Sequence, residues 1–147
     1  MTKYFTLILF VLSICSISTG QERRLYIEGY DRLRYSIEEI RVSPGIRIEL
    51  TFKTVSELPE SQMAHNWLLL KKDVDLQEFV ARSVRHEENE YIDPELTGKI
   101  VATTSMLGGG EQETIRFTAP QDRGEYPYVC TFPGHYAAGM KGTLIVE

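Results

Sequence analysis

A cysteine, a histidine and a methionine recur at five-residue intervals in one short segment near the C-terminus. The segment reads CTFPGHYAAGM and runs from Cys130 through His135 to Met140, between two strand-like runs at residues 125–129 and 143–146. Loops of this kind normally collect Gly, Asn, Ser and Asp, because those residues suit turn geometry. Two soft sulfur atoms and an imidazole in such a loop therefore point to metal binding.

The loop can fold so that these three side chains meet. Cys130 ends its strand, and Met140 stands at the entrance to the next one. Gly134 and Gly139 allow backbone angles that other residues resist, so the chain between them can turn tightly. The spacing therefore allows Cys130, His135 and Met140 to converge on one point.

Three ligands leave such a site incomplete, and two further histidines are present. His65 lies in SQMAHNWLLL, beside an apolar strand that would hold a ligand rigidly. His86 lies in ARSVRHEENEY, on the polar tail of an expected helix, where a solvated surface residue is the usual interpretation. His65 is therefore the better fourth ligand.

One cysteine and two histidines with a weak axial methionine make the ligand set of a blue-copper electron-transfer site. In such a site the Cys130 thiolate would give strong charge transfer to the metal. The imidazoles of His65 and His135 would stabilise either oxidation state, and the soft Met140 sulfur would favour Cu(I). We therefore expect one type 1 copper ion as the cofactor.

Zinc binding and ordinary core packing are the alternatives. Zinc accepts Cys and His, but structural zinc sites usually have four such ligands in paired spacings, and a thioether is a poor zinc ligand. Buried Cys and Met are common core residues, so each residue taken singly is more often structural. Their combination at this spacing favours copper.

The first 20 residues have the order of a secretory signal peptide. Lys3 is followed by an apolar run over residues 4–17 and by the small residues Ser18-Thr19-Gly20. We expect residues 1–20 to be removed and residues 21–147 to form one domain. The apolar run is shorter than the roughly 20 residues of a spanning helix, and no later segment would cross a bilayer.

The signal peptide predicts that the protein is exported and is therefore periplasmic or secreted. A lipid anchor would use Cys15, but Ile14 stands where lipid-attachment motifs place a small residue. Cys130 is the only cysteine of the mature chain, and a free thiol is a liability in an oxidising compartment, so a metal should occupy it. The net charge of −5, or −6 without Lys3, and the lack of a basic cluster exclude nucleic-acid binding.

Short runs of alternating apolar residues dominate the rest of the chain. In GIRIELTFK, Ile46, Ile48, Leu50 and Phe52 fall on one face of a half-buried strand. We expect strands at residues 24–28, 36–42, 46–54, 64–70, 99–104, 113–118, 125–130 and 142–146.

One helix interrupts these strands, over about residues 75–88. Leu76, Phe79 and Val80 recur at helical spacing, and Asp75 with Glu78 makes a capping pair. Many short strands with one inserted helix predict an all-β, Greek-key β-sandwich of about eight strands.

Two segments resemble the cupredoxins, specifically the azurin and auracyanin group. They are MAHNWLL at residues 63–69 and CTFPGHYAAGMKGTLIV at residues 130–146, with weaker likeness in ELPESQ and KIVATTSMLGGGEQETIRF. The resemblance implies an eight-stranded sandwich with copper near one end. It also implies that the equatorial ligands are His65, Cys130 and His135, with Met140 as the axial ligand.

The resemblance also implies details around these ligands. Ala64 stands where azurins have a glycine whose carbonyl approaches copper, and the four residues between His135 and Met140 match auracyanins better than azurins. Azurin's disulfide has no counterpart here. Asn66 would tie the two ligand segments together, and the backbone N–H groups of Asn66 and Phe132 would point at the Cys130 sulfur.

In this interpretation the outer ring edge of His135 reaches the surface. A flat apolar patch around it would suit brief docking of a redox partner. The net negative charge favours a basic partner such as a c-type cytochrome. The apolar patch is expected to consist of Met63, Phe132, Pro133, Ala137 and Ala138.

Three function classes follow from this site. The first is an exported carrier of single electrons without catalysis of its own. The second is an enzyme, either a copper oxidase or a nitrite reductase. Such enzymes need a further copper cluster, which three histidines cannot supply, so we expect no enzyme activity. The third class is a copper-storage protein or chaperone, although such proteins tend to offer exposed, repeated Met or Cys ligands.

Overall fold

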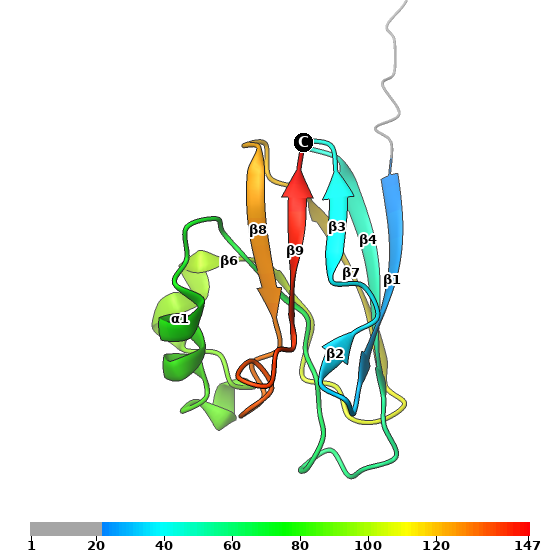
Figure 1. Cartoon of the computed structure of the whole chain (residues 1–147), viewed down its shortest axis with the longest axis vertical. Helices are drawn as coiled ribbons and strands as arrows, with labels where there is room; N and C mark the ends of the chain where they lie inside the picture. Colours follow the sequence, from blue (N-terminus) through cyan, green and yellow to red (C-terminus); the bar gives the residue numbers. More distant parts are fainter. Residues whose placement is uncertain (1–21) are drawn as a thin grey trace, which may run out of the picture.

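Two β-sheets pack face to face in residues 22–147, the part of the chain that this computed structural model describes (Figure 1). The predicted signal peptide, residues 1–20, lies outside the described residues. The first sheet has the order β2 (Arg34–Tyr35), β1 (Glu22–Tyr30), β4 (Arg47–Val55) and β7 (Gln112–Thr118). The second has the order β3 (Glu39–Val42), β9 (Lys141–Val146), β8 (Gly124–Val129), β5 (Leu68–Leu70) and β6 (Ile100–Thr103).

The predicted all-β sandwich with one inserted α-helix is confirmed. Strand β4 shows how the alternating pattern produces a sandwich. Ile48, Leu50 and Phe52 are buried between the sheets, while the residues between them face outward. Strands β1 and β3 pair in parallel with β4 and β9, and the other pairings are antiparallel. Sequence-distant strands therefore lie side by side in both sheets.

The core fills the space between the sheets. Fully burying a large apolar side chain contributes about 1.5–3 kcal/mol, so this core is the main source of stability. Aromatic rings concentrate near its centre: the Trp67 and Tyr128 ring centroids lie 5.3 Å apart, and those of Tyr35 and Tyr128 lie 5.4 Å apart. Leu69 of β5 enters this core, whereas Leu68 and Leu70 face a second cluster under the helix.

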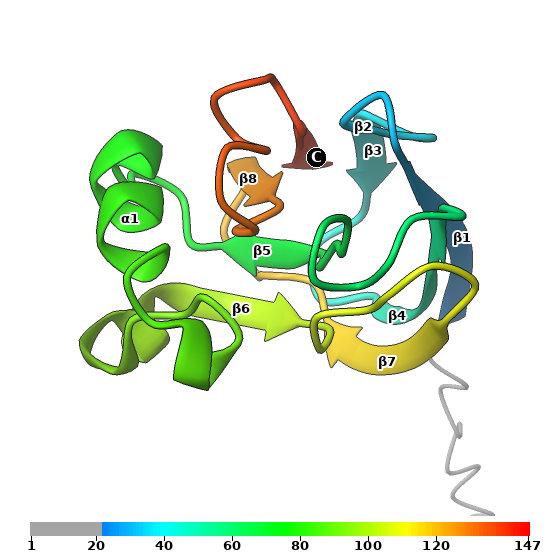
Figure 2. The same ribbon diagram turned by 90° about the horizontal axis from the view of Figure 1, so that it is seen from below.

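The helix α1 (Leu76–Ser83) is shorter than the predicted range of residues 75–88. The Asp75 carboxylate caps its start, accepting a hydrogen bond of 3.0 Å from the Glu78 N–H. The apolar periodicity stops after Val84, the C-cap residue, and the short 3₁₀ helices η1 (Glu87–Asn89) and η2 (Pro94–Lys99) follow. In Figure 2, α1 lies next to β5 and β6, on the side away from β1 and β4.

Two strands are also shorter than their predicted ranges. The run at residues 36–42 gives β3 only from Glu39, with a bend before it, and β2 precedes the run. In the run at residues 64–70 only Leu68–Leu70 is a strand, although every residue of the run is buried. Before that strand, His65 makes only an isolated antiparallel bridge to Leu107.

The two ends of the sandwich differ in what they carry. In Figure 1 the start of β1 and the C-terminus lie at the upper end, whereas the loop between β8 and β9 lies toward the lower end. The loop that joins β4 to β5 reaches the same lower end. Within residues 22–147, no helix has the length and apolar character needed to cross a membrane.

Candidate metal centre

Three donor side chains from two distant segments meet inside the lower end of the sandwich. The His65 and His135 Nδ1 atoms lie 3.1 Å apart, and the Cys130 sulfur lies 3.9 Å from the first and 3.4 Å from the second. All three residues are buried. His86 is not in this group; its Nδ1 lies 3.2 Å from the Glu88 carboxylate instead.

Met140 lies beside this group. Its side chain is fully buried, its N–H donates to the His135 carbonyl at 2.9 Å, and its carbonyl accepts from the Cys130 N–H at 3.2 Å. A Cβ added at Gly29 of β1 would come within 3.0 Å of the Met140 methyl carbon and 3.1 Å of the His65 ring. The Met140 and His65 side chains therefore both lie against Gly29 of β1, and a larger residue at this position would press on both of them.

Burial sets the protonation of the three donors. It lowers the pKa of His65 to about 4, with a further contribution from the neighbouring His135, and it lowers the pKa of His135 to about 4. Both imidazoles are therefore neutral near pH 7, with lone pairs available. Burial raises the pKa of the Cys130 thiol to about 12, although the backbone N–H groups of Asn66 and Phe132 act in the opposite direction. Binding of a metal would release this proton.

The donor set fits a copper ion. Its chemistry is one thiol, two neutral imidazoles and an adjacent thioether, without the carboxylates that Mg²⁺ and Ca²⁺ need. One proton at most can lie between the facing Nδ1 atoms of His65 and His135. The Nε2 atom of His65 is also buried and has no hydrogen-bond partner among the described residues. A soft cation would satisfy lone pairs that the protein leaves facing one another.

A buried amide joins the two segments that carry the donors. The Asn66 side chain accepts from the Thr131 N–H at 2.9 Å and donates to the Thr131 hydroxyl at 2.8 Å. The Tyr35 hydroxyl donates to the Asn66 carbonyl at 2.7 Å. Both ends of this connection are fully buried, so it fixes His65 relative to Cys130. No local pattern in the sequence predicts the contact of Tyr35, and only the position of Thr131 inside CTFPGH is a signal for that of Thr131.

Arg34 is a further residue that contacts the site without a signal in the sequence, and it contacts the loop from outside. Its guanidinium donates to the carbonyls of Leu33 at 2.8 Å and Ala138 at 2.6 Å. Gly139, with φ of +103°, lets the guanidinium lie against the loop, since a Cβ there would come within 2.8 Å of it. No local pattern around Arg34 reveals this contact, which spans more than 100 residues of sequence.

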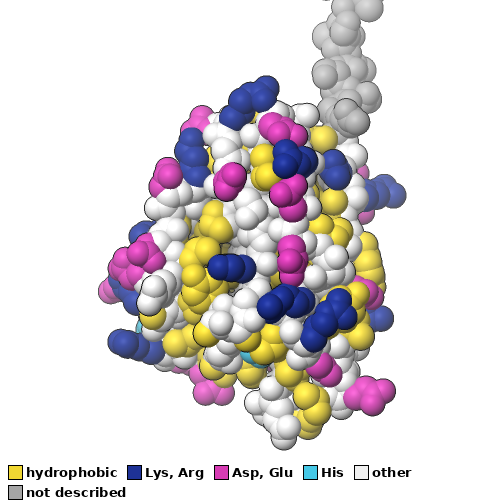
Figure 3. Space-filling view, in the orientation of Figure 1, with side chains coloured by type: hydrophobic (Ala, Val, Ile, Leu, Met, Phe, Trp, Pro, Cys, Tyr) yellow, Lys and Arg dark blue, Asp and Glu magenta, His cyan; other side chains and the backbone are white. Residues whose placement is uncertain are grey.

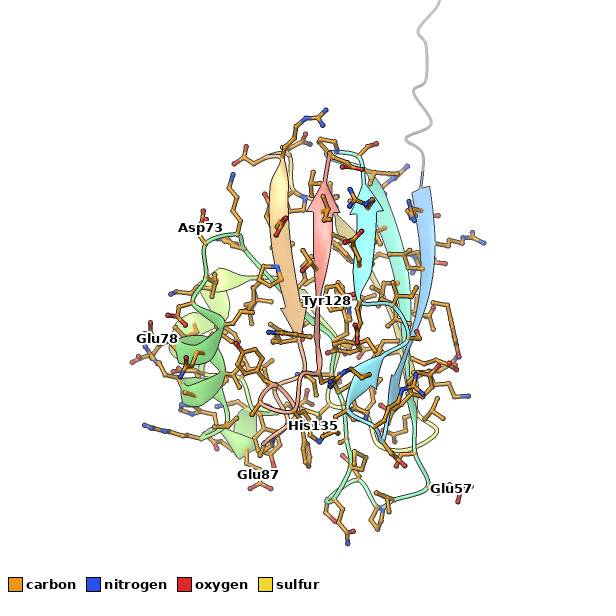
Figure 4. All side chains as sticks on the ribbon, viewed as in Figure 1. Glu57, Asp73, Glu78, Glu87, Tyr128 and His135 are labelled. Atoms are coloured by element: carbon orange, nitrogen blue, oxygen red, sulfur yellow. The ribbon has the colours of Figure 1, made fainter. Side chains whose placement is uncertain are left out.

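His135 is almost completely buried, with 4% of the residue exposed. Its ring lies 4.7 Å from the Phe132 ring, centroid to centroid. Around it, Pro133, Ala137 and Ala138 are exposed, whereas Met63 and Phe132 are half-buried. Figure 3 shows hydrophobic side chains at this lower end, and Figure 4 places His135 there.

Comparisons with known proteins agree with this chemistry. Residues 22–147 match the family described as copper binding proteins, plastocyanin/azurin family. The chain is 33% identical to auracyanin-B of Chloroflexus aurantiacus over 117 residues, which are 79% of this chain and 48% of that protein. It is 34% identical to azurin-1 of Alcaligenes xylosoxydans xylosoxydans over 122 residues, 80% of this chain and 92% of that protein.

Solved structures give the same picture. The fold resembles dithionite-reduced auracyanin from Roseiflexus castenholzii with a TM-score of 0.75 and 34% identity, covering 84% of this chain and 96% of that one. The chain spans less than two thirds of the length of two relatives. It covers 61% of outer membrane protein H.8 of Neisseria meningitidis and 48% of auracyanin-B. Both longer relatives therefore contain segments to which this chain has no match.

Proposed function

The chain belongs to the plastocyanin/azurin family of copper-binding proteins, and on that premise we propose that it carries single electrons between redox proteins outside the cytoplasm. The observation that carries the proposal is the meeting of the Cys130 sulfur with the Nδ1 atoms of His65 and His135 in a buried group. Family relatives such as azurin and auracyanin support the same class of function.

In this proposal His65, Cys130, His135 and Met140 would hold the copper ion. Bound copper supplies one-electron oxidation and reduction between Cu(I) and Cu(II). The protein supplies neutral imidazoles, a thiolate and a rigid frame, in which the Asn66 bonds to Thr131 keep the donors in one arrangement. Small rearrangement of the ligands favours fast electron transfer. The Ala64 carbonyl, in the residue before His65, is a candidate further contact.

Electrons would enter and leave near His135. The apolar patch of Met63, Phe132, Pro133, Ala137 and Ala138 would let a partner approach that ring closely without binding tightly. A signal peptide over residues 1–20 would direct the mature chain to the periplasm or outside the cell, with Gln21 as its first residue. A mass spectrum of the exported protein tests the cleavage position.

A copper-storage protein or chaperone is the second candidate, and the geometry argues against it. Exchange of copper needs ligands that another protein can reach, whereas Cys130 and Met140 are fully buried and His135 is 4% exposed. A copper oxidase or nitrite reductase would need a further cluster of histidines. The whole sequence has three, and His65 and His135 are already in the buried group.

Copper titration with voltammetry tests the proposal. Adding Cu(II) to the purified protein should give an intense blue or blue-green absorption at one equivalent, followed by a fast, reversible one-electron wave. A His86→Gln variant is the matched control and should behave as the wild type, whereas His65→Gln should lose the colour. A colourless adduct would overturn the copper site, and loss of metal on reduction would indicate storage instead.

A further inference from the structure

Gly29 of β1 brings the first sheet against the metal centre, although none of the four proposed ligands lies in a strand of that sheet. A Cβ added at Gly29 would lie 3.0 Å from the Met140 methyl carbon, 3.0 Å from the Phe52 ring and 3.1 Å from the His65 ring. Gly29 is buried and its φ is not positive, so alanine could adopt the same backbone conformation. The position therefore needs glycine for the space that it leaves.

The backbone of β1 cannot easily move away from the metal centre. Gly29 is paired on both sides, with Thr54 of β4 and with Tyr35 of β2. The preceding Glu28 donates its N–H to the Ser36 hydroxyl at 2.9 Å, and its carbonyl accepts from the Ser36 N–H at 2.8 Å. A shift of β1 would break hydrogen bonds to two neighbouring strands. An added Cβ would therefore have to be accommodated by the three side chains that it contacts.

Two of these three side chains have little room to yield. Phe52 is fully buried, and its ring packs against the Tyr35 ring with the centroids 5.9 Å apart. The His65 N–H donates to the Leu107 carbonyl at 3.0 Å, and the Leu107 N–H donates to the His65 carbonyl at 2.9 Å. The Leu107 carbonyl also accepts a bond of 2.9 Å from the Thr54 hydroxyl. His65 is therefore tied to β4, the neighbour of β1.

Met140 is the side chain that can yield. Its backbone is fixed by the bonds to His135 and Cys130, but its unbranched side chain has three rotatable bonds. The contact with Gly29 involves the terminal methyl carbon, which is bonded directly to the sulfur. Displacing this carbon would turn the whole thioether. The space at Gly29 therefore influences where the Met140 sulfur lies relative to the other donors.

We propose that Gly29 is a positioning residue: the space that it leaves sets the direction of the Met140 thioether and hence the strength of its interaction with copper. This inference rests on the proposed function, because it concerns one of the proposed ligands. A side chain at this position would turn the sulfur out of its place beside the other donors. The weaker sulfur interaction would favour Cu(I), as loss of the sulfur would.

A double-mutant cycle with Met140→Leu tests this role. Leucine has no atom in the place of the methionine methyl carbon, so in that variant an added Cβ at residue 29 would not meet this contact. The wild type, Gly29→Ala, Met140→Leu and the combined variant are compared. Gly98→Ala is the matched control, because Gly98 is exposed, has no positive φ, and a Cβ there would meet nothing within 4 Å.

Voltammetry of the copper-loaded proteins gives the first measurement. Gly29→Ala should shift the relative affinity for the two oxidation states about threefold toward Cu(I), a rise of about 28 mV at about 59 mV per tenfold change. The same substitution in the Met140→Leu background should leave the potential nearly unchanged, and so should Gly98→Ala. Gly29→Ala should keep its intense colour, because the added Cβ has no close contact with Cys130.

Urea unfolding of the copper-free proteins gives a second measurement, which does not depend on the metal. Gly29→Ala should lower the free energy of unfolding in the wild-type background, because the added carbon overpacks the space beside the Met140 methyl group. It should not lower this free energy in the Met140→Leu background. If Gly29→Ala alone does not fold, the combined variant should fold, and failure of both would overturn the proposal.

Three further outcomes are decisive. An equal rise in potential in both backgrounds would overturn the proposal, because Gly29 would then act through His65 or Phe52. An unchanged or lowered potential in Gly29→Ala would also overturn it. A colourless copper adduct of the wild-type protein would instead defeat the proposed function, so the two failures are distinguishable.

Discussion

The two halves of the metal centre are built differently. His65 and Cys130 form one half, which we call the framework half, and His135 with Met140 forms the loop half. Around the framework half the hydrogen bonds are buried and join distant segments, as between Asn66 and Thr131. The loop half is held mainly by local backbone bonds, such as those from Ala138 to Gly134 and from Met140 to His135.

This difference predicts different consequences of mutation. A buried hydrogen bond that loses one partner costs the desolvation of the other, about 1–3 kcal/mol, whereas water can replace an exposed one. Loss of a buried hydrogen bond in the framework half should therefore damage both the fold and the ligand geometry. Changes in the loop half should adjust the properties of the site while the fold remains intact.

The largest effect is expected from Cys130→Ser in the framework half. Serine is nearly isosteric, but its hydroxyl provides no thiolate for charge transfer to copper. The intense visible absorption should be abolished, while the circular dichroism of the copper-free protein stays close to that of the wild type. A Ser105→Ala variant, at an exposed site, is the control. An intense blue colour in Cys130→Ser would mean that the sulfur is not a ligand.

The next largest effect is expected from Asn66→Ala. This change leaves the buried N–H and hydroxyl of Thr131 without their partner, so the free energy of unfolding should fall by about 2 kcal/mol. Urea unfolding of the copper-free protein measures this loss. The absorption of the copper-loaded variant should also shift, because the segments that carry His65 and Cys130 are no longer held together by the bonds between Asn66 and Thr131. Asn89→Ala, at an exposed position, should change neither quantity. Unchanged stability in Asn66→Ala would show that the framework half is held in another way.

The sequence predicted the donors better than the contacts that position them. The residue type alone determines which metals a side chain can bind, and the spacing of Cys130, His135 and Met140 limits where they can lie. Gly29 and Tyr35 contact the same site, but their roles depend on the pairing of β1 with β4 and on core packing. Such long-range register leaves no pattern in the residues around them.

The fold was likewise predicted where periodicity decides it. Strand β4 matches its alternating pattern, whereas the buried run at residues 64–70 is strand only from Leu68. There the backbone of His65 pairs with Leu107, and the Trp67 N–H donates to the Thr104 hydroxyl at 3.0 Å. Apolar character showed that the run is buried. It could not show that the first residues turn toward the metal centre.

A smaller effect is expected from Met140→Leu in the loop half. Leucine keeps the apolar volume, so the colour and the fold should remain. A weak thioether donor favours Cu(I) relative to a stronger donor, but the absence of any donor at this position favours Cu(I) further, so the reduction potential should rise. Each tenfold change in the relative affinity for the two oxidation states corresponds to about 59 mV. Voltammetry measures the shift against Met106→Leu, because Met106 lines a surface groove with Glu90 and Phe132 and is not one of the proposed ligands. An unchanged potential would mean that Met140 is not a ligand.

The smallest effect is expected from Arg34→Met, which removes the guanidinium that contacts the loop half from outside. Methionine keeps the apolar stem, so the free energy of unfolding should fall by about 1 kcal/mol at most, because the lost bond to Ala138 is exposed and the lost bond to Leu33 is only part-buried. Removing a positive charge near the site stabilises Cu(II), so the potential should fall, opposite in sign to Met140→Leu. The shift should stay below about 59 mV, because the Debye length in 0.1 M salt is about 10 Å and the charge is exposed.

Arg41→Met is the matched control, since Arg41 pairs with Glu147 at the other end of the sandwich and should leave the potential unchanged. Two measurements on Arg34→Met sharpen the comparison. A fall in potential with unchanged absorption would mean that the guanidinium acts by its charge. A shifted absorption would mean that it positions the loop. If Arg34→Met altered the absorption as strongly as Asn66→Ala, the loop half would depend on buried and surface contacts alike, and the distinction between the two halves would fail.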